Sequence, residues 1–468
     1  MCGRADNDLI FQRLSARPLK FQSKLHFKEG RNLIKLTPTH IRNRFYDTLA
    51  EMNQNRSLYV KQPEKDFTRS GTFSFQQTML FITQMQSHST NQELNNFFIP
   101  RNKQVTQSAF VQAKGKLNED AFPSFLHMLN KKFPLHKTLS GLHIFAVDGS
   151  DLNIPADKKD CSTFIPYNSK NGGYHQMHIN ALFDLLENRF TGVVIQPRKS
   201  MREVEAACSL VDANDTPGTC LYIFDRGYES LNLMAHVCER GNFFLIRAKD
   251  VCSQVSPFRL LTLPGEMEFD FPVRFICTRS GKLKKKDPVL FKLFQKKQRF
   301  DFIPPNDKTG AYELRFRLVK LKLDNGTTEY LITNLPQKKF PQSEIKKLYN
   351  LRWGIEVSFL FAKYRVSMNF FHSIKREYII QEIIAKLILF NLVSLIISCH
   401  EIPFSDTLYH YKISFSDAVY KCRSFLLKSK AYENITILLL HDLTPIRPDR
   451  SFNRNLQSQR LRTLQHRP

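Results

Sequence analysis

Three short, uninterrupted apolar runs most restrict the fold that this sequence can adopt. They lie at residues 144–147, 221–224 and 243–246. Runs of this length that do not alternate with polar residues are typical of strands buried on both faces, as in parallel sheets covered by helices. Between the first two runs, residues 177–183 and 192–195 predict two further strands. The middle of the chain therefore predicts an α/β domain.

The segment before these strands is predicted to be helical. Thr37 is a suitable N-cap with Pro38 at the first helical position, and it begins an amphipathic helix flanked by Arg42 and Arg44. Two further stripes with helical spacing are more typical of core than of binding surface: Phe75, Met79 and Ile82, and Phe122, Leu126 and Leu129. The basic flanks of the first helix suit a DNA-contacting module, and an ordinary amphipathic helix explains them equally well.

In residues 251–336 the sequence pattern changes, and apolar and polar residues alternate with a period of two. The stretches 314–318 and 320–323 alternate, and Asp324-Asn325-Gly326 predicts a tight turn into another strand. We expect an antiparallel β segment with one basic face. A lysine run in this segment at 282–286 is most simply a solvated loop, with phosphate contact as the alternative.

These changes of pattern predict five regions. Their expected roles are a helical N-terminal region for binding DNA ends, a core in two parts separated by the β-rich insertion, and a C-terminal helical region with a basic tail. The boundaries, in the same order along the chain, are 1–138, 139–250, 251–336, 337–400 and 401–468.

The charge of the chain points to a polyanionic partner. Its 69 Lys and Arg against 43 Asp and Glu give a formal net charge of +26, which favours nucleic acid. A membrane partner is not expected, because the most apolar run, 387–397, is shorter than the ~20 residues that a span requires and predicts a buried core helix. Nine cysteines without a CxxC pair are typical of a reducing cytoplasm.

Four polar residues predict a phosphate-binding face on a helix. Tyr349, Arg352, Glu356 and Lys363 are spaced 3, 4 and 7 residues apart, so one helix would carry them as a single stripe. Arg and Lys bind phosphate oxygens, and a tyrosine hydroxyl can donate to one. Trp353, close to this stripe, is either a core residue, which is the simpler interpretation, or a platform on which an unpaired base stacks.

Two aspartates directly follow predicted strands. Asp148 and Asp225 come after the first and second apolar runs, where a carboxylate is both rigid and accessible. Taken alone, each aspartate is more simply a turn or cap residue, because Asp near Gly is common in turns. Together with Glu356, the two could bring three carboxylates to one site. Hard oxygen ligands suit Mg²⁺ or Mn²⁺, and two such ions can promote an in-line phosphoryl transfer. Asp151 is an alternative to Asp148, which we prefer because it adjoins the strand.

The chain resembles the DDE transposases of the bacterial insertion-sequence-4 family. The resemblance rests on Asp148, Asp225 and Glu356 with the Tyr-x2-Arg-x3-Glu-x6-Lys signature at 349–363, and on four shorter motifs at 148–150, 225–228, 244–247 and 333–336. It covers about residues 105–400. It implies an RNase H-like catalytic core with an inserted β segment, and a bacterial cytoplasmic protein associated with the nucleoid.

The resemblance also implies an activity and its partners. A protein of this kind is expected to cleave double-stranded DNA at terminal inverted repeats and to join the 3′ ends to target DNA, as a homodimer. Two alternatives stay open: an RNase H-like nuclease without strand transfer, and a catalytically silent DNA-binding protein derived from a transposase. The carboxylate set argues against the silent protein, because DNA binding alone gains nothing from acidic side chains beside a phosphate.

Overall fold

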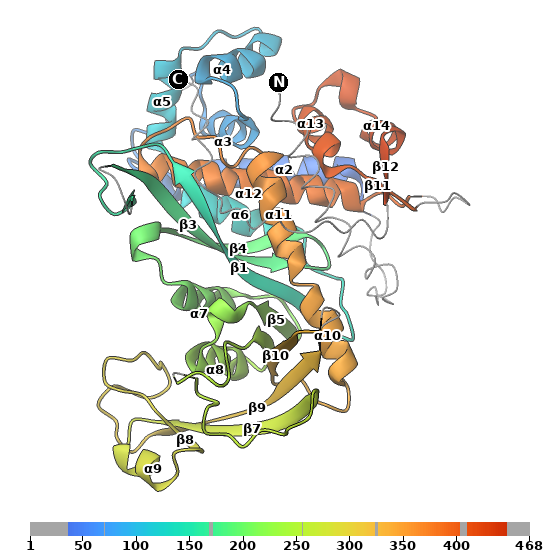
Figure 1. The fold of residues 1–468 in the computed structure, drawn as a ribbon. Helices are drawn as coiled ribbons and strands as arrows, with labels where there is room; N and C mark the ends of the chain where they lie inside the picture. Colours follow the sequence, from blue (N-terminus) through green and yellow to red (C-terminus); the bar gives the residue numbers. More distant parts are fainter. Residues whose placement is uncertain are drawn as a thin grey trace.

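The computed structural model describes residues 36–69, 71–167, 172–254, 256–322, 326–402 and 410–446. The first 35 residues, the tail from 447 and residues 324–325 of the predicted turn lie outside this part. The described chain is a mixed α/β fold in which helices of both ends cover one large sheet (Figure 1).

Among the described residues, five α-helices precede the sheet, and three of them carry the predicted stripes. The first begins where expected, because the Thr37 side chain caps it by accepting a hydrogen bond from the backbone N–H of His40 at 3.3 Å. The five are α2 (Pro38–Gln54), α3 (Phe75–Gln84), α4 (Thr90–Phe98), α5 (Gln107–Lys116) and α6 (Ala121–Lys132), and the stripes lie on α2, α3 and α6. The predicted apolar stripes of α3 and α6 are buried, which confirms that they are core.

The central strands form in the order that the apolar runs predicted. They are β1 (His143–Ile154), β2 (Phe164–Pro166), β3 (Gly173–Asp184), β4 (Arg189–Pro197), β5 (Cys220–Phe224) and β6 (Phe243–Arg247). Across the sheet they are arranged β4-β3-β1-β5-β6. The pairs β1–β5 and β5–β6 are parallel, and β3 is antiparallel to β1 and β4.

The strand β1 extends further than its apolar run. Its parallel pairing with β5 ends at Val147 and Phe224, but its antiparallel pairing with β3 continues to Ile154. Asp148 therefore lies inside β1 and not directly after it, so that prediction was wrong. The apolar run marks only the part of the strand that helices cover on both faces, and β1 becomes more polar where β5 stops.

The β-rich segment continues the same sheet. It contains β7 (Phe269–Thr278), a short helix α9 (Gly281–Lys286), β8 (Phe291–Leu293), β9 (Ala311–Lys322) and β10 (Thr328–Thr333). The strand β10 pairs with β6, and the order then runs β10-β9-β7-β8. The pairs β9–β10 and β7–β9 are antiparallel as predicted, whereas the short β8 is parallel to β7. The lysine run forms α9 at the far end of the sheet (Figure 1).

Two apolar cores lie on opposite faces of the central strands. Along β1, Ile144 and Ala146 belong to one core, while Phe145 and Val147 belong to the other. This follows because successive side chains of a strand point to opposite faces of the sheet. The second core includes residues of α7 (Glu203–Ala213) and α8 (Leu231–Glu239). The first includes residues of α10 (Gln342–Asn350), α11 (Trp353–Tyr364) and α12 (Arg376–Ser398), together with the N-terminal helices.

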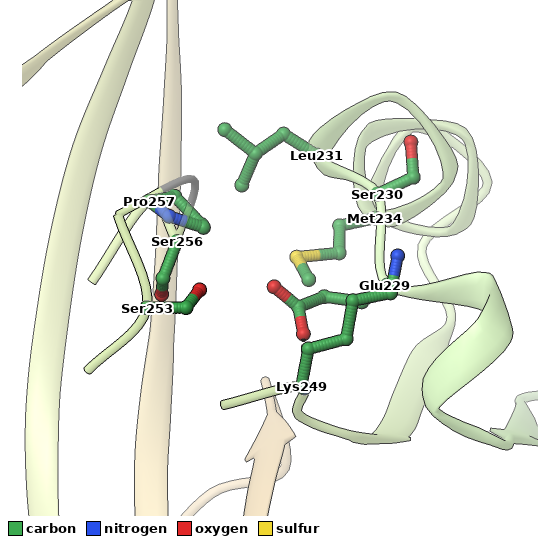
Figure 2. A pocket seen from close by; sticks show the side chains of 8 residues that line it. All are labelled: Glu229, Ser230, Leu231, Met234, Lys249, Ser253, Ser256 and Pro257. Carbon is green, nitrogen blue, oxygen red and sulfur yellow. Dashed lines mark hydrogen bonds between the residues drawn. The ribbon is translucent and has the colours of Figure 1, made fainter. Parts of the chain in front are cut away.

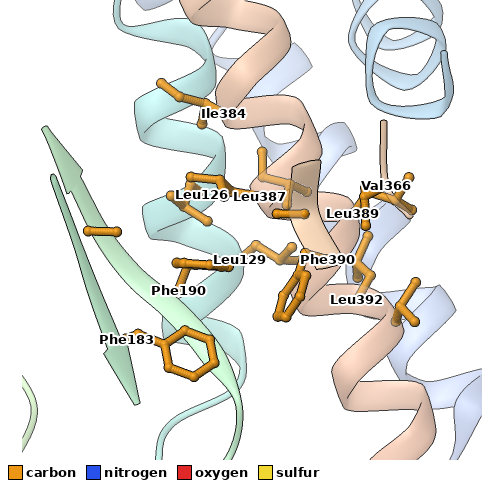
Figure 3. Close-up of a cluster of buried hydrophobic side chains, with 14 of the residues drawn as sticks. Leu126, Leu129, Phe183, Phe190, Val366, Ile384, Leu387, Leu389, Phe390 and Leu392 are labelled. Atoms are coloured by element: carbon orange, nitrogen blue, oxygen red, sulfur yellow. The ribbon is translucent and has the colours of Figure 1, made fainter. Parts of the chain in front are cut away.

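The long helix α12 is the centre of the larger core. Its leucines and Phe390 pack between α6 and the β3–β4 hairpin, where Phe183 and Phe190 meet them (Figure 3). By length and composition α12 could cross a membrane, but 94% of its most apolar 18-residue window is buried within the fold. This confirms the prediction of a buried core helix.

The C-terminal region packs on α12. It comprises β11 (His410–Ile413), α13 (Phe415–Leu426), α14 (Ile435–His441) and β12 (Leu443–Ile446), with β11 and β12 forming a small antiparallel sheet. The ring of Phe415 lies 4.8 Å from that of Phe390, which anchors α13 to the core.

Candidate active site

Three elements bring the predicted carboxylates to the same end of the parallel strands. Asp148 follows the last parallel pair on β1, and Asp225 follows the same pair on β5, so the two residues leave neighbouring strands at the same level. Helix α11 packs against β1 and carries Glu356 in its first turn. Residues far apart in the sequence thus meet where the parallel strands end.

The side chain of Arg352 joins two of these carboxylates. Its Nη2 donates to Glu356 Oε1 at 2.7 Å, and its Nη1 lies 3.5 Å from Asp148 Oδ2. The guanidinium is only 7% exposed, whereas the two carboxylates are 27% and 20% exposed. The two acids are therefore partly exposed, and the cation that links them is buried.

Tyr349 reaches the third carboxylate. Its hydroxyl donates to Asp225 Oδ1 at 3.4 Å, and its ring centre is 5.8 Å from the guanidinium of Arg352. Burial raises the pKa of the phenol, so the hydroxyl keeps its proton and remains a donor. Arg352 thus contacts Asp148 and Glu356, and Tyr349 contacts Asp225.

The polar stripe is not carried by one helix, so that prediction was wrong. Helix α10 ends at Asn350, and α11 begins at Trp353. Between the two helices the backbone forms 3₁₀-type hydrogen bonds, in which each N–H donates to the carbonyl oxygen three residues earlier. These bonds run from Leu351 to Leu348, from Arg352 to Tyr349 and from Gly354 to Leu351. Because Leu351 and Arg352 keep right-handed helical dihedrals, the break is small.

The other two carboxylates act on the pKa of Asp148. Burial raises the pKa of Asp148 to about 6, although Arg352 and the Gly149 N–H act in the opposite direction. The carboxylates of Glu356 and Asp225 raise it further. The ionised form of Asp148, which burial and the two neighbouring carboxylates disfavour, would gain from a further cation.

Lys363 lies apart from the carboxylates. Its ammonium donates to the backbone oxygen of Asp151 at 2.7 Å, and burial lowers its pKa to about 8 despite the charge of Asp151. The Asp151 carboxylate, the alternative to Asp148, is bonded instead to His178 and Arg198. The structure therefore groups Asp148, and not Asp151, with Asp225 and Glu356.

Trp353 is half-buried beside this site. The guanidinium of Arg352 lies 5.4 Å from the centre of its ring. The residue is not one of the fully buried core side chains of the described chain. Part of the indole therefore remains at the surface.

One further charged pair adjoins the site. Arg247, the last residue of β6, forms a 2.7 Å ion pair with Glu329 of β10, and both charges act on Tyr349. Burial raises the pKa of Glu329, while Arg247 lowers it. No sequence pattern predicted that Glu329 lies near this site, because its position depends on the pairing of β10 with β6.

The oxygen donors suit a divalent metal ion, but the acids are not gathered around one point. Asp148, Asp225 and Glu356 offer the hard ligands that Mg²⁺ and Mn²⁺ prefer. Within the described residues, no three acidic, histidine or cysteine side chains are close enough together to share an ion. The guanidinium of Arg352 takes the position between Asp148 and Glu356.

A separate cavity of about 310 Å³ opens between α8 and the loop after β6. Glu229, Ser230, Leu231, Met234, Lys249, Ser253, Ser256 and Pro257 line it, and the carboxylate of Glu229 faces its interior (Figure 2). None of the predicted site residues contributes to this cavity.

Comparison with known proteins identifies the family. A family model described as a transposase DDE domain matches residues 140–392. No curated protein matches the chain. Among solved structures, the chain is similar to the piggyBac transposase in its synaptic complex with hairpin DNA, with a TM-score of 0.43 and 10% identity, over 93% of this chain and 90% of that chain.

The family match covers all three carboxylates and the residues around them. It confirms the resemblance to DDE transposases at the level of the family, and it does not extend to the insertion-sequence-4 group or its signature. Because the model matches more than half of the chain, the protein belongs to the family of DDE transposases.

Proposed function

We propose that this protein is a cut-and-paste transposase of the insertion-sequence-4 group. It cleaves double-stranded DNA at terminal inverted repeats and joins the 3′ ends to target DNA. The observation that carries this proposal is the contact of the Arg352 side chain with both Asp148 and Glu356, beside the Tyr349 hydroxyl that bonds Asp225. Acids grouped in a strongly basic protein suit phosphoryl transfer on a polyanion.

The catalytic roles follow from the positions of the side chains. Asp148, Asp225 and Glu356 would hold Mg²⁺ or Mn²⁺, with two ions as the preferred number. When bound, the ions would activate the attacking oxygen and offset charge on the leaving oxygen. Arg352 and Tyr349 would orient phosphate oxygens beside the carboxylates.

Two further residues of α11 would act on the DNA beyond the carboxylates. Lys363, about two turns after Glu356, would contact a neighbouring phosphate as a point charge. The half-buried ring of Trp353 would stack on an unpaired base.

The strand order supports an RNase H-like core. The arrangement β4-β3-β1-β5-β6, with β3 antiparallel to its neighbours and β1, β5 and β6 parallel, places two acids at the centre of the sheet. We assign the core to residues 139–250 and 337–400, and the β-rich insertion to 251–336. The helical regions 1–138 and 401–468 flank it, and the first would bind the DNA ends.

The proposed setting follows from the activity. A homodimer would pair the two ends of the element, and the protein would act on DNA in the bacterial cytoplasm, at the nucleoid. The basic balance of the chain favours this partner.

The proposal is tested with purified protein, Mg²⁺ and a duplex that carries the inverted repeat and its flank. Asp148→Asn, Asp225→Asn and Glu356→Gln should each reduce the rate of cleavage at least ~100-fold, which corresponds to ~2.7 kcal/mol of transition-state stabilisation. DNA affinity should change little. Asp212→Asn, at an acid that pairs with His236 away from the site, is the matched control and should cleave normally.

The products distinguish the alternatives. Joined 3′ ends in target DNA support transposition, whereas cleavage without joining would indicate a nuclease. Binding without any cleavage would indicate a silent DNA-binding protein. Unchanged cleavage in the three acidic variants would refute the assignment of the site.

A further inference from the structure

A second charged cluster lies on the other face of β1 from Asp148. His178 of β3 is the direct partner of Asp151 across the β1–β3 ladder, and its Nδ1 lies 2.6 Å from Asp151 Oδ1. On its other side, Nε2 is 3.2 Å from Glu203 Oε1, in the first turn of α7. Arg198 completes the cluster, with its Nε 3.1 Å from Asp151 Oδ1. The imidazole therefore lies between two carboxylates.

The imidazole at the centre of the cluster is charged although it is buried. The side chain of His178 is only 4% exposed. Burial lowers its pKa, but Asp151 and Glu203 outweigh that effect and raise the pKa to about 9. At neutral pH the ring is therefore an imidazolium, which can attract both carboxylates at once. It ties β1 to β3 and to the start of α7.

The glycine after Asp148 leaves room for this ring. A Cβ on Gly149 would lie 2.6 Å from His178 Nε2 and 3.1 Å from Glu203 Oε1, and the first distance is closer than real contacts allow. The cluster is thus in contact with the backbone of the residue that directly follows Asp148. A displacement of His178 would be transmitted to β1 at that point.

The same strand segment is held from the other side by the catalytic helix. The ammonium of Lys363 donates to the backbone oxygen of Asp151 at 2.7 Å. Asp151 thus bonds α11 through its carbonyl and His178 through its carboxylate. Residues 148–151 lie between the helix that carries Glu356 and the cluster that His178 centres.

We propose that His178 is a positioning residue, which with Asp151 and Glu203 holds residues 148–151 of β1 so that Asp148 keeps its place relative to Glu356 and Lys363 of α11. The catalytic part of this inference rests on the proposed function. His178 lies on the face of the sheet away from Glu356, so it touches neither substrate nor the reacting atoms.

Two substitutions separate the two contacts of the ring. The amide nitrogen of Asn stands near the position of Nδ1, so His178→Asn can keep the bond to Asp151. The amide nitrogen of Gln stands near Nε2, so His178→Gln can keep only the contact with Glu203. His175→Asn is the matched control, because His175 is also a buried histidine of β3 and its Nδ1 bonds Thr163 Oγ1 at 2.8 Å.

Hydrogen exchange of the full-length protein, followed by mass spectrometry, tests the clamp without any need for activity. In His178→Gln the amides of residues 148–152 should exchange at least ~10-fold faster, and Lys363 should react faster with an amine-selective acylating reagent. His178→Asn should change both less. The control should leave both at the wild-type rate.

Single-turnover cleavage with Mg²⁺ tests the consequence. His178→Gln should cleave at least ~10-fold more slowly, with DNA affinity within about twofold of wild type, and His178→Asn should recover part of the loss. Wild-type exchange, acylation and cleavage in His178→Gln would overturn the inference. Rates that fall only in proportion to the unfolded fraction would also overturn it. Absence of cleavage in the wild-type protein would refute the proposed function instead, while exchange and acylation would still decide whether His178 holds β1.

Discussion

At the scale of single residues, the most informative side chain is that of Arg352. The sequence predicted that it would share a face with Glu356, and the structure also places it against Asp148. The second contact was not predictable, because it depends on α11 packing against β1. Arg352 is therefore a structural cation as well as a candidate for phosphate binding.

Removing this cation should destabilise the fold. Arg352→Gln removes the cation that links Asp148 and Glu356, so the free energy of unfolding should fall by ~3 kcal/mol, and Arg352→Lys should lose less. Urea denaturation in a metal-free buffer measures the difference. Arg315→Gln, at an arginine that is 75% exposed and 2.6 Å from Glu313, should change the stability by less than ~0.5 kcal/mol. Equal losses in the two variants would contradict this account.

His178 gives a prediction on pH. Its pKa rises from the ordinary 6.5 to about 9 on folding, so the folded state binds the proton more tightly. The stabilisation is complete below pH 6.5 and is lost as the pH rises through 9, by ~3 kcal/mol in total. The quantity to measure is the difference in unfolding free energy between wild type and His178→Asn at pH 6 and pH 10. A difference that does not shrink with rising pH would show that His178 is not charged in the folded state.

At the scale of the elements, the sequence predicted the presence of the strands better than the residues at which they end. The runs at 144–147 and 221–224 were recognisable because helices cover both faces of those strands. Beyond Val147 the pattern of β1 becomes mixed, so only its pairing with β3 defines the rest of the strand. The break between α10 and α11 could not be predicted from the sequence either, because the spacing of Tyr349, Arg352 and Glu356 also fits a continuous helix.

The start of α11 depends on close packing at Gly354. A Cβ there would lie 2.8 Å from Leu185 Cδ2, and Leu185 is buried in the larger core. Gly354→Ala should therefore destabilise the protein by ~1–2 kcal/mol, even though alanine favours a helix by up to ~1 kcal/mol. Cleavage should also slow, because Arg352 and Glu356 flank the displaced turn.

A control for that substitution is available in α9. Gly281 is also a helical glycine, and a Cβ added to it meets nothing within 4 Å. Gly281→Ala should be neutral or slightly stabilising, as measured by thermal melting. If the two substitutions had the same effect, contact with Leu185 would not explain the glycine at 354.

At the scale of the whole molecule, the β-rich segment is an extension of the catalytic sheet. Its alternating pattern predicted antiparallel strands, but it could not show that β10 pairs with β6 and makes one sheet of ten strands within the described residues. That pairing has no local signal, because it joins segments separated by more than 80 residues. It places the lysine-rich tip, the end of the sheet at α9 and β8, on the same continuous sheet as Asp148.

The tip is suited to contact DNA far from the site of cleavage. Five exposed lysines, at positions 282, 285, 286, 296 and 297, form no ion pair with another described residue. The strand β8 lies six strands from β1, which is up to ~29 Å at the usual spacing. This corresponds to ~8 base pairs of duplex at ~3.4 Å each. A duplex must therefore extend about that far from the scissile phosphate before the tip can bind it.

Replacing all five lysines with glutamine should weaken the binding of a long duplex and should not affect a duplex that ends within ~6 base pairs of the cleavage position. The slope of log affinity against log salt should become shallower by ~0.9 for each phosphate contact that is lost. Arginine at the same five positions preserves the charge and should preserve both affinity and slope. Fluorescence anisotropy at several salt concentrations measures these quantities. An equal loss for short and long duplexes would mean that the lysines act through the overall charge of the protein, because only a localised contact depends on the length of the DNA.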